Sequence, residues 1–149
     1  MSAGRETGPR SWRNRNPGNV RPVALPDRWQ GQVAVDTAPG GPFSVFGDDA
    51  AGWRAVCKVL LRYQGAYKLG SVRAMLYRYA PPAENLTDAY VASVCAKLGV
   101  APDDAVDVRN WPVMRAMLAA IAGVEGGSTC PPWPESGVIE GMTRAGLRP

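Results

Sequence analysis

The sequence contains no histidine and only three cysteines among its 149 residues. The missing histidine excludes histidine-based catalytic triads and histidine-rich metal sites, so any acid–base chemistry would fall to Asp or Glu. Cys57, Cys95 and Cys130 are an odd number without paired short spacing, which indicates reduced thiols rather than a disulfide framework or a zinc knuckle. We therefore expect no metal site and no cofactor.

Long apolar runs are also missing from the sequence. No run approaches the roughly 20 residues that cross a bilayer, and residues 1–12 lack the apolar stretch of a signal peptide. The net charge of +4 raises the question of nucleic-acid binding, but no recognisable DNA- or RNA-binding motif accompanies it, and basic charge also suits anionic cell envelopes. We expect no membrane span and no specific nucleic-acid partner.

The first part of the chain is rich in Arg, Asn, Pro and Gly. Four prolines within residues 1–28 break any helix there, so we predict a flexible arm over residues 1–12 followed by one domain over residues 13–149. Alternating apolar and polar residues over 32–35 and 43–46 predict a small β-hairpin.

After the hairpin, apolar periodicity and capping residues predict five helices. The expected helix starts are Asp48 or Asp49, Ser71, Thr87, Asn110 and Ser136. Five helices with one hairpin predict an α+β fold that is mostly α. In the connection before the fourth helix, the cluster of Asp103, Asp104 and Asp107 lacks the spacing of a calcium loop and indicates a solvated linker.

The most unusual string, Arg-Asn-Arg-Asn-Pro-Gly-Asn-Val-Arg, covers residues 13–21. Asn14, Asn16 and Asn19 supply amide donors and acceptors on a backbone that Pro17 and Gly18 restrict. Such a loop either caps its own turns or hydrogen-bonds a polar ligand. A flanking arginine such as Arg13 offers a planar fork to phosphate or carboxylate.

Three strings together resemble a family of small tailed-phage and prophage proteins. They cover residues 14–21, residues 43–63 with Phe43-x-x-Phe46, and residues 79–90, which read Tyr-Ala-Pro-Pro-Ala-Glu-Asn-Leu-Thr-x-x-Tyr. In that family the first string resembles R-N-N-N-P-G-N-I-R and the last W-A-P-P-x-E-N-x-T-x-x-Y. The resemblance implies a virion-associated or prophage-encoded peptidoglycan hydrolase of the lysozyme or lytic transglycosylase type, although many members are described only as structural proteins.

The family also carries an H-E-N-G-like string at the end of a late helix. The matching residues here are Val-Glu-Gly-Gly at 124–127, so the His and the Asn are replaced. The resemblance places Glu125 as the candidate acid. Because the order of the glutamate and the asparagine string is reversed relative to lysozymes, it further suggests a circularly permuted lysozyme-like fold in which both strings line one cleft.

Independent residue chemistry also points to Glu125. It follows an apolar helical face and adjoins glycines that leave room for a substrate. A helix C-terminus and apolar surroundings both raise the pKa of a carboxyl, and a protonated carboxyl can donate a proton to a glycosidic oxygen. The alternative without a functional role is a solvated glutamate at a fraying helix end.

Glu84 is the rival acid. It precedes a helix, where backbone N–H groups lower the pKa of a carboxylate, so it suits a charge-stabilising role or a simple helix-start position better than proton donation. From the same string we assign Asn85 and Tyr90 to substrate binding. Trp29 and Trp133, in loops rich in Pro and Gly, are candidates for stacking on a sugar.

The sequence therefore predicts a peptidoglycan-degrading glycosidase or lytic transglycosylase of phage or prophage origin. It would reside in the virion or the host cytoplasm before release and act at the bacterial cell wall or in the periplasm, with peptidoglycan and other virion proteins as partners. The alternative is a non-catalytic virion structural or adaptor protein on a lysozyme-like scaffold.

Overall fold

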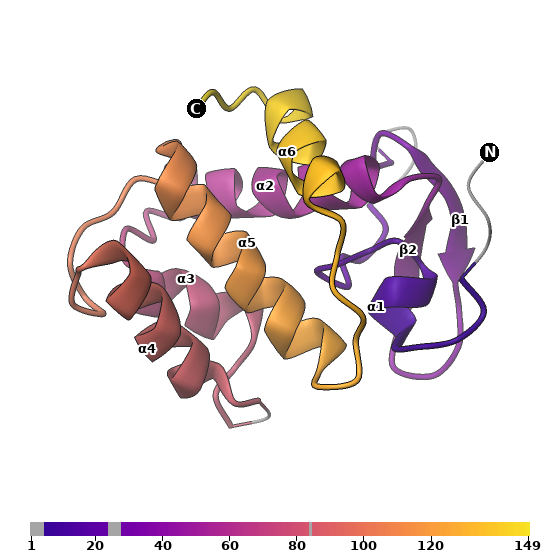
Figure 1. The fold of residues 1–149 in the computed structure, drawn as a ribbon, viewed down its shortest axis with the longest axis horizontal. Coiled ribbons are helices and arrows are strands. Elements are labelled where there is room, and N and C mark those ends of the chain that lie inside the picture. Colours follow the sequence, from indigo (N-terminus) through magenta and orange to yellow (C-terminus); the bar gives the residue numbers. More distant parts are fainter. Residues whose placement is uncertain (1–4, 24–27, 84) are drawn as a thin grey trace.

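A computed structural model describes residues 5–23, 28–83 and 85–149. Six helices and one two-stranded antiparallel sheet follow one another in these residues, which confirms the predicted α+β, mostly α class. In Figure 1, α5 crosses the middle of the molecule, α3 and α4 lie on one side of it, and α1 and the hairpin lie near its C-terminal end.

The hairpin consists of β1 (Gln32–Asp36) and β2 (Phe43–Phe46), as the alternation predicted. Asp36 pairs with Phe43, and a bulge lies between Gln32 and Ala34. The inner strand β2 buries Ser44 and Phe46, whereas β1 exposes Val33 and Val35. One face of β2 thus packs on the body while β1 forms the outer edge.

Local capping explains most helix boundaries. Helix α2 (Asp49–Gly65) begins where Asp48 accepts a hydrogen bond from Ala51 N at 2.8 Å, and α3 (Val72–Tyr79) begins where Ser71 accepts from Ala74 N at 3.1 Å. These two predicted caps are confirmed.

Predicted boundary residues of the next two helices are also confirmed. Helix α4 (Thr87–Leu98) ends at Gly99, which takes the left-handed conformation at φ 68°. Helix α5 (Trp111–Gly126) begins where Asn110 accepts a hydrogen bond from Val113 N, with Pro112 in its first turn.

Two predicted boundaries are wrong. Helix α6 (Glu135–Arg144) starts at Glu135 after Pro134, so Ser136 lies inside its first turn and is not the cap. Residues 1–28 are not free of helix either, because Arg10–Arg13 form the short helix α1. Both errors have one cause: a proline with φ near −60° immediately before the first turn preorganises the chain for a helix instead of breaking it.

Part of the predicted flexible arm lies on the body of the protein. Ser11 is buried, and the Arg5 guanidinium lies 3.5 Å from the centre of the Trp12 ring and 2.9 Å from the Asp49 carboxylate. The ion pair therefore ties Arg5 to α2, and the cation–π contact holds Arg5 against Trp12 of the same segment. Residues 1–4 lie outside the described residues.

The core forms where α5 meets α2, α3 and α4. Its largest fully buried side chains include Leu60, Met75, Met114, Met117 and Ile121. Helix α6 packs along α2. This core fixes α5 against α2 and α3 and thereby sets where the C-terminal end of α5 lies.

Several side chains outside the candidate site belong to the core or to the exposed linker before α5. Trp53 is buried, and Trp111 packs against the core. Cys57 and Cys95 are buried and free, and burial raises the pKa of the Cys57 thiol to about 12. The linker aspartates Asp103, Asp104 and Asp107 are exposed.

Candidate active site

A cavity of about 480 Å³ lies where the 14–21 loop, α2, the end of α3 and the C-terminal end of α5 meet. Its wall contains both polar groups and aromatic rings, as expected for a saccharide site. Among the described residues that line it, Glu125 is the one carboxylate. Four predicted site residues belong to the lining: Asn19, Trp29, Asn85 and Glu125.

Glu125 lies in the last turn of α5, which ends at Gly126. Its side chain is half-buried, and burial raises the pKa of its carboxyl above the ordinary value of 4.5. A hydrogen bond that Asn19 Nδ2 donates to Oε2 at 3.4 Å partly offsets this rise. The structure thus brings Glu125 beside the asparagine loop, and burial shifts the pKa of Glu125 in the direction that the sequence predicted.

The three loop asparagines have different environments. Asn16 is fully buried and bonds internally: its Nδ2 donates to Val20 O and Ser44 O, and its Oδ1 accepts from Val20 N. Asn14 is also buried, and its amide donates to Asp36 at 2.9 Å. Only Asn19 turns its amide to the cavity, at φ 46°, a left-handed conformation that asparagine tolerates.

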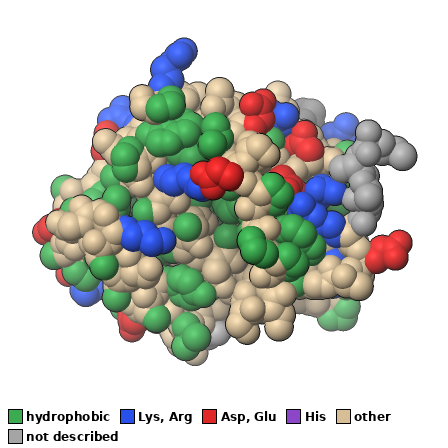
Figure 2. All heavy atoms as spheres, viewed as in Figure 1, with side chains coloured by type: hydrophobic (Ala, Val, Ile, Leu, Met, Phe, Trp, Pro, Cys, Tyr) green, Lys and Arg blue, Asp and Glu red, His purple; other side chains and the backbone are tan. Residues whose placement is uncertain are grey.

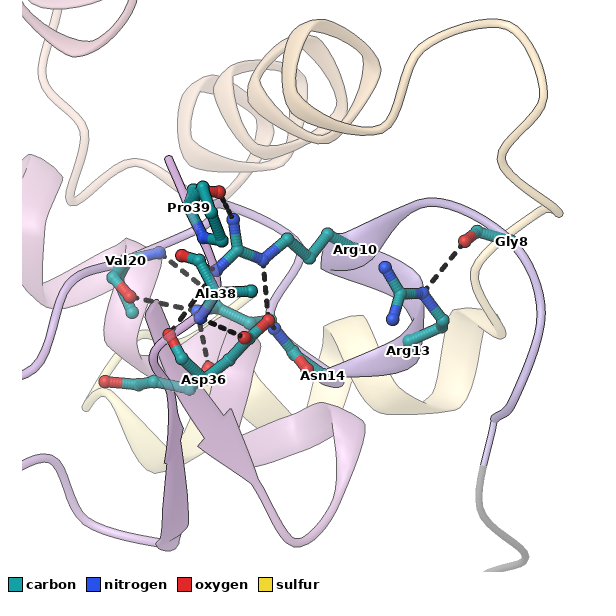
Figure 3. Close-up of polar contacts among 10 residues, drawn as sticks. Gly8, Arg10, Arg13, Asn14, Val20, Asp36, Ala38 and Pro39 are labelled. Atoms are coloured by element: carbon teal, nitrogen blue, oxygen red, sulfur yellow. Dashed lines mark hydrogen bonds and ion pairs between the residues drawn. The ribbon is translucent and has the colours of Figure 1, made fainter. Parts of the chain in front are cut away.

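A polar network anchors the loop to the hairpin (Figure 3). The Arg10 guanidinium donates to the Asp36 carboxylate at 2.6 Å and also to the carbonyls of Ala38 and Pro39. The bonds from Arg10 and Asn14 hold the pKa of Asp36 well below its usual range. Asn14 and Asn16 therefore shape the loop, and Asn19 is the one of its three asparagines that lines the cavity.

Gly18 allows the loop to approach α2 and α3 closely. A Cβ atom at this position would overlap the Tyr79 hydroxyl and lie 2.6 Å from Val56 Cγ2. The hydroxyl of Tyr79 donates to Gly18 O at 2.6 Å. Burial and the nearby Glu125 charge raise the pKa of Tyr79 well above its ordinary value, so it stays a neutral donor.

Trp29 and Asn85 lie in the cavity wall with their own polar groups engaged. Trp29 Nε1 donates to Arg21 O at 2.8 Å, which leaves its ring at the cavity. Asn85 Nδ2 donates to Pro81 O at 3.1 Å. The rival acid Glu84 lies outside the described residues.

The structure does not bring the other three predicted binding residues to this cavity. Tyr90 packs its ring over Gly123 of α5. Trp133 lies edge-on against Trp12 and Trp53 and lines a separate cavity of about 280 Å³. Arg13 is exposed and donates to Gly8 O.

Sequence reasoning missed several lining residues, above all Tyr63, Tyr79 and Phe43. Tyr63 and Tyr79 lie edge to face with ring centres 6.3 Å apart. Tyr63 lies in the last turn of α2 and Tyr79 is the last residue of α3. The available signal was their place within the motif strings 43–63 and 79–90.

Two features are absent from the part of the chain that the structure describes. No cluster of three or more Cys, Asp or Glu side chains could hold a metal ion. No helix there has both the length and the apolarity to cross a membrane.

Comparison with known proteins finds a relative encoded by a phage. No family model matches it. It is 30% identical over 120 residues to Protein P5 of Pseudoalteromonas phage PM2, and the aligned region covers 80% of this chain and 72% of the phage protein. The chain belongs to the Protein P5 family. A phage relative is consistent with the predicted phage or prophage origin and compatible with virion partners.

Proposed function

We propose that this member of the Protein P5 family cleaves β-1,4 bonds between the amino sugars of peptidoglycan, with Glu125 as the general acid. The observation that carries the proposal is the half-buried Glu125 carboxyl, whose pKa is raised, in a cavity beside the Asn19 amide and aromatic rings. A carboxyl that stays protonated near neutral pH can protonate a leaving oxygen. The resemblance of the motif strings to lysozyme-like phage proteins is the second support for the proposal.

The reaction begins with proton transfer from Glu125 to the glycosidic oxygen. The bond from C1 to that oxygen breaks, and its electron pair goes to the oxygen. In a lytic transglycosylase the C6 hydroxyl of the same sugar then bonds to C1 and returns its proton to the Glu125 carboxylate. Tyr79 holds the loop through its bond to Gly18 O, and Asn19 holds the Glu125 carboxyl.

The lining favours transglycosylation over hydrolysis. Hydrolysis by glycosidases normally uses a second carboxylate as nucleophile or base, whereas Glu125 is the one carboxylate among the described lining residues. Intramolecular attack by the sugar hydroxyl needs only the one. We therefore expect an anhydro-sugar product, lighter by one water than the product of hydrolysis.

The first prediction concerns Glu125→Gln. The amide has almost the same shape but cannot donate the proton, so we expect the loss of turbidity of permeabilised bacterial cells to slow by about 10²-fold or more. Glu6→Gln, the same change at an exposed position, should leave the rate unchanged. Mass analysis of products from purified sacculi identifies the reaction type.

An unchanged rate for Glu125→Gln would remove Glu125 from the mechanism, and Glu84→Gln would then be the next variant to assay. The second candidate function is a non-catalytic virion structural or adaptor protein. The replaced His and Asn around Glu125 favour it. An inactive wild-type protein that still cosediments with sacculi would establish this second function.

A further inference from the structure

A second groove, of about 730 Å³, lies on the other side of Trp29 from the candidate active site. Its wall carries four cationic side chains: Arg28 from the loop, and Arg54, Lys58 and Arg62 from α2. No carboxylate belongs to its described lining. By contrast, the face seen in Figure 2 mixes acidic and basic side chains.

The fold does not use these charges. The three α2 cations follow one another at four-residue intervals on one helix face, an arrangement of like charges that destabilises a helix. Within the described ranges, Arg28, Arg54 and Lys58 have no carboxylate partner, and Arg62 contacts only the Tyr67 ring and hydroxyl. The Arg54 Nε is buried without a hydrogen-bond partner. A stripe that costs stability and pairs with no acid among the described residues fits an external anion.

The groove and the active-site cavity are neighbours along α2. Val59 and Tyr63 line the cavity, while the adjacent residues Lys58 and Arg62 line the groove. Trp29 belongs to both walls and is held by its hydrogen bond to Arg21 O. A ligand in the cavity with an anionic branch beside Trp29 would therefore reach the cations.

We propose that this groove binds the carboxylates of the peptide stems of peptidoglycan while the glycan strand lies in the cavity. The inference rests on the proposed function. Peptidoglycan carries peptide branches with free carboxylates on alternate sugars, and guanidinium groups bind carboxylates through paired hydrogen bonds. The substrate is thus a stem-bearing strand rather than the bare glycan.

The test compares two ligands, soluble glycan strands with their peptide stems and strands from which an amidase has removed them. Binding is measured in the Glu125→Gln background to prevent turnover. The added pair Lys58→Gln and Arg62→Gln should weaken binding of stem-bearing strands on the order of tenfold. It should therefore lower the preference for stem-bearing over bare strands. Lys97→Gln, at an exposed position on α4, is the matched control.

Three results would overturn the inference. If the protein with an unaltered groove bound both strands with equal affinity, the groove would not be a stem-binding site, whereas the proposed function would stand. Binding of neither strand would overturn the proposed function together with this inference. Displacement of stem-bearing strands by a short DNA duplex at physiological salt would assign the groove to nucleic acid instead.

Discussion

At the scale of single residues, the Asn19–Glu125 contact influences the pKa of the Glu125 carboxyl. Burial raises the pKa of Glu125, and the Asn19 amide lowers it by stabilising the ionised form. The two effects oppose each other, so the contact tunes the pH at which Glu125 loses its proton. An acid must be protonated to act, and activity therefore falls as the pH rises through its pKa.

Asn19→Asp tests this tuning. The variant keeps the shape and tolerates the left-handed backbone at φ 46°, but it replaces a hydrogen-bond donor by a second negative charge. We expect the pKa of Glu125 to rise and the alkaline limb of the kcat/KM profile to move to higher pH. Asn85→Asp adds a charge to the cavity wall without removing a bond to Glu125 and should shift the limb less. An unmoved limb would mean that another group sets it.

At the scale of elements, the position of the 14–21 loop depends on a glycine between two helices. Gly18 lies against Tyr79 of α3 and Val56 of α2, and Gly52 of α2 lies against the loop at Pro17. These close approaches hold the loop in the corner between the two helices. They explain why the loop presents Asn19 and not its other asparagines to the cavity.

Gly18→Ala should lower the free energy of unfolding by about 1–3 kcal/mol, because the added methyl group overlaps Tyr79 and Val56. Gly65→Ala is the matched change at the end of α2, where a Cβ atom meets nothing within 4 Å. We expect it to be neutral or stabilising by up to about 1 kcal/mol. Urea unfolding measures both, and similar midpoints for the two variants would contradict the packing argument.

Elements with local signals were predictable from the sequence. The hairpin follows from the alternation within its two strands, and the helices capped by Asp48, Ser71 and Asn110 follow from capping contacts three residues along the chain. The site was predictable only in part: motif resemblance selected Glu125 and Asn19. The resemblance could not distinguish Asn19 from Asn14 and Asn16. The environment of each amide depends on β2 and Asp36, which lie more than 20 residues away.

The loop tryptophans show the same limit. Composition made Trp29 and Trp133 equal candidates for stacking on a sugar, yet Trp29 lines the cavity of the candidate site and Trp133 packs with Trp12 and Trp53. Which ring reaches the cavity depends on how the loops cross the helices, and no pattern within either loop encodes that crossing.

At the scale of the whole molecule, the candidate acid costs folding stability. The pKa of Glu125 is raised in the folded protein above its ordinary value of 4.5, so the contribution of this group is fully favourable below that value. It is lost as the pH rises through the folded pKa. Near neutral pH the folded protein therefore either keeps the proton against bulk pH or holds a poorly solvated charge.

Glu125→Gln should consequently melt at a higher temperature than the wild type at neutral pH. The difference should shrink below pH 4.5, where both forms are uncharged. Thermal melts across this pH range measure it, with Glu6→Gln as the exposed reference. A variant less stable than the wild type at neutral pH would contradict the assignment of a desolvated carboxyl.

The Asn19–Glu125 contact joins residues 106 positions apart. Severing the chain in the exposed connection between α4 and α5 would leave the amide on one fragment and the carboxyl on the other. Neither piece would hold the complete candidate site, so under the proposed function lysis would return only on reassembly. The proposed activity could thus be divided between two inactive fragments, and the clearing of a bacterial suspension would report their reassembly.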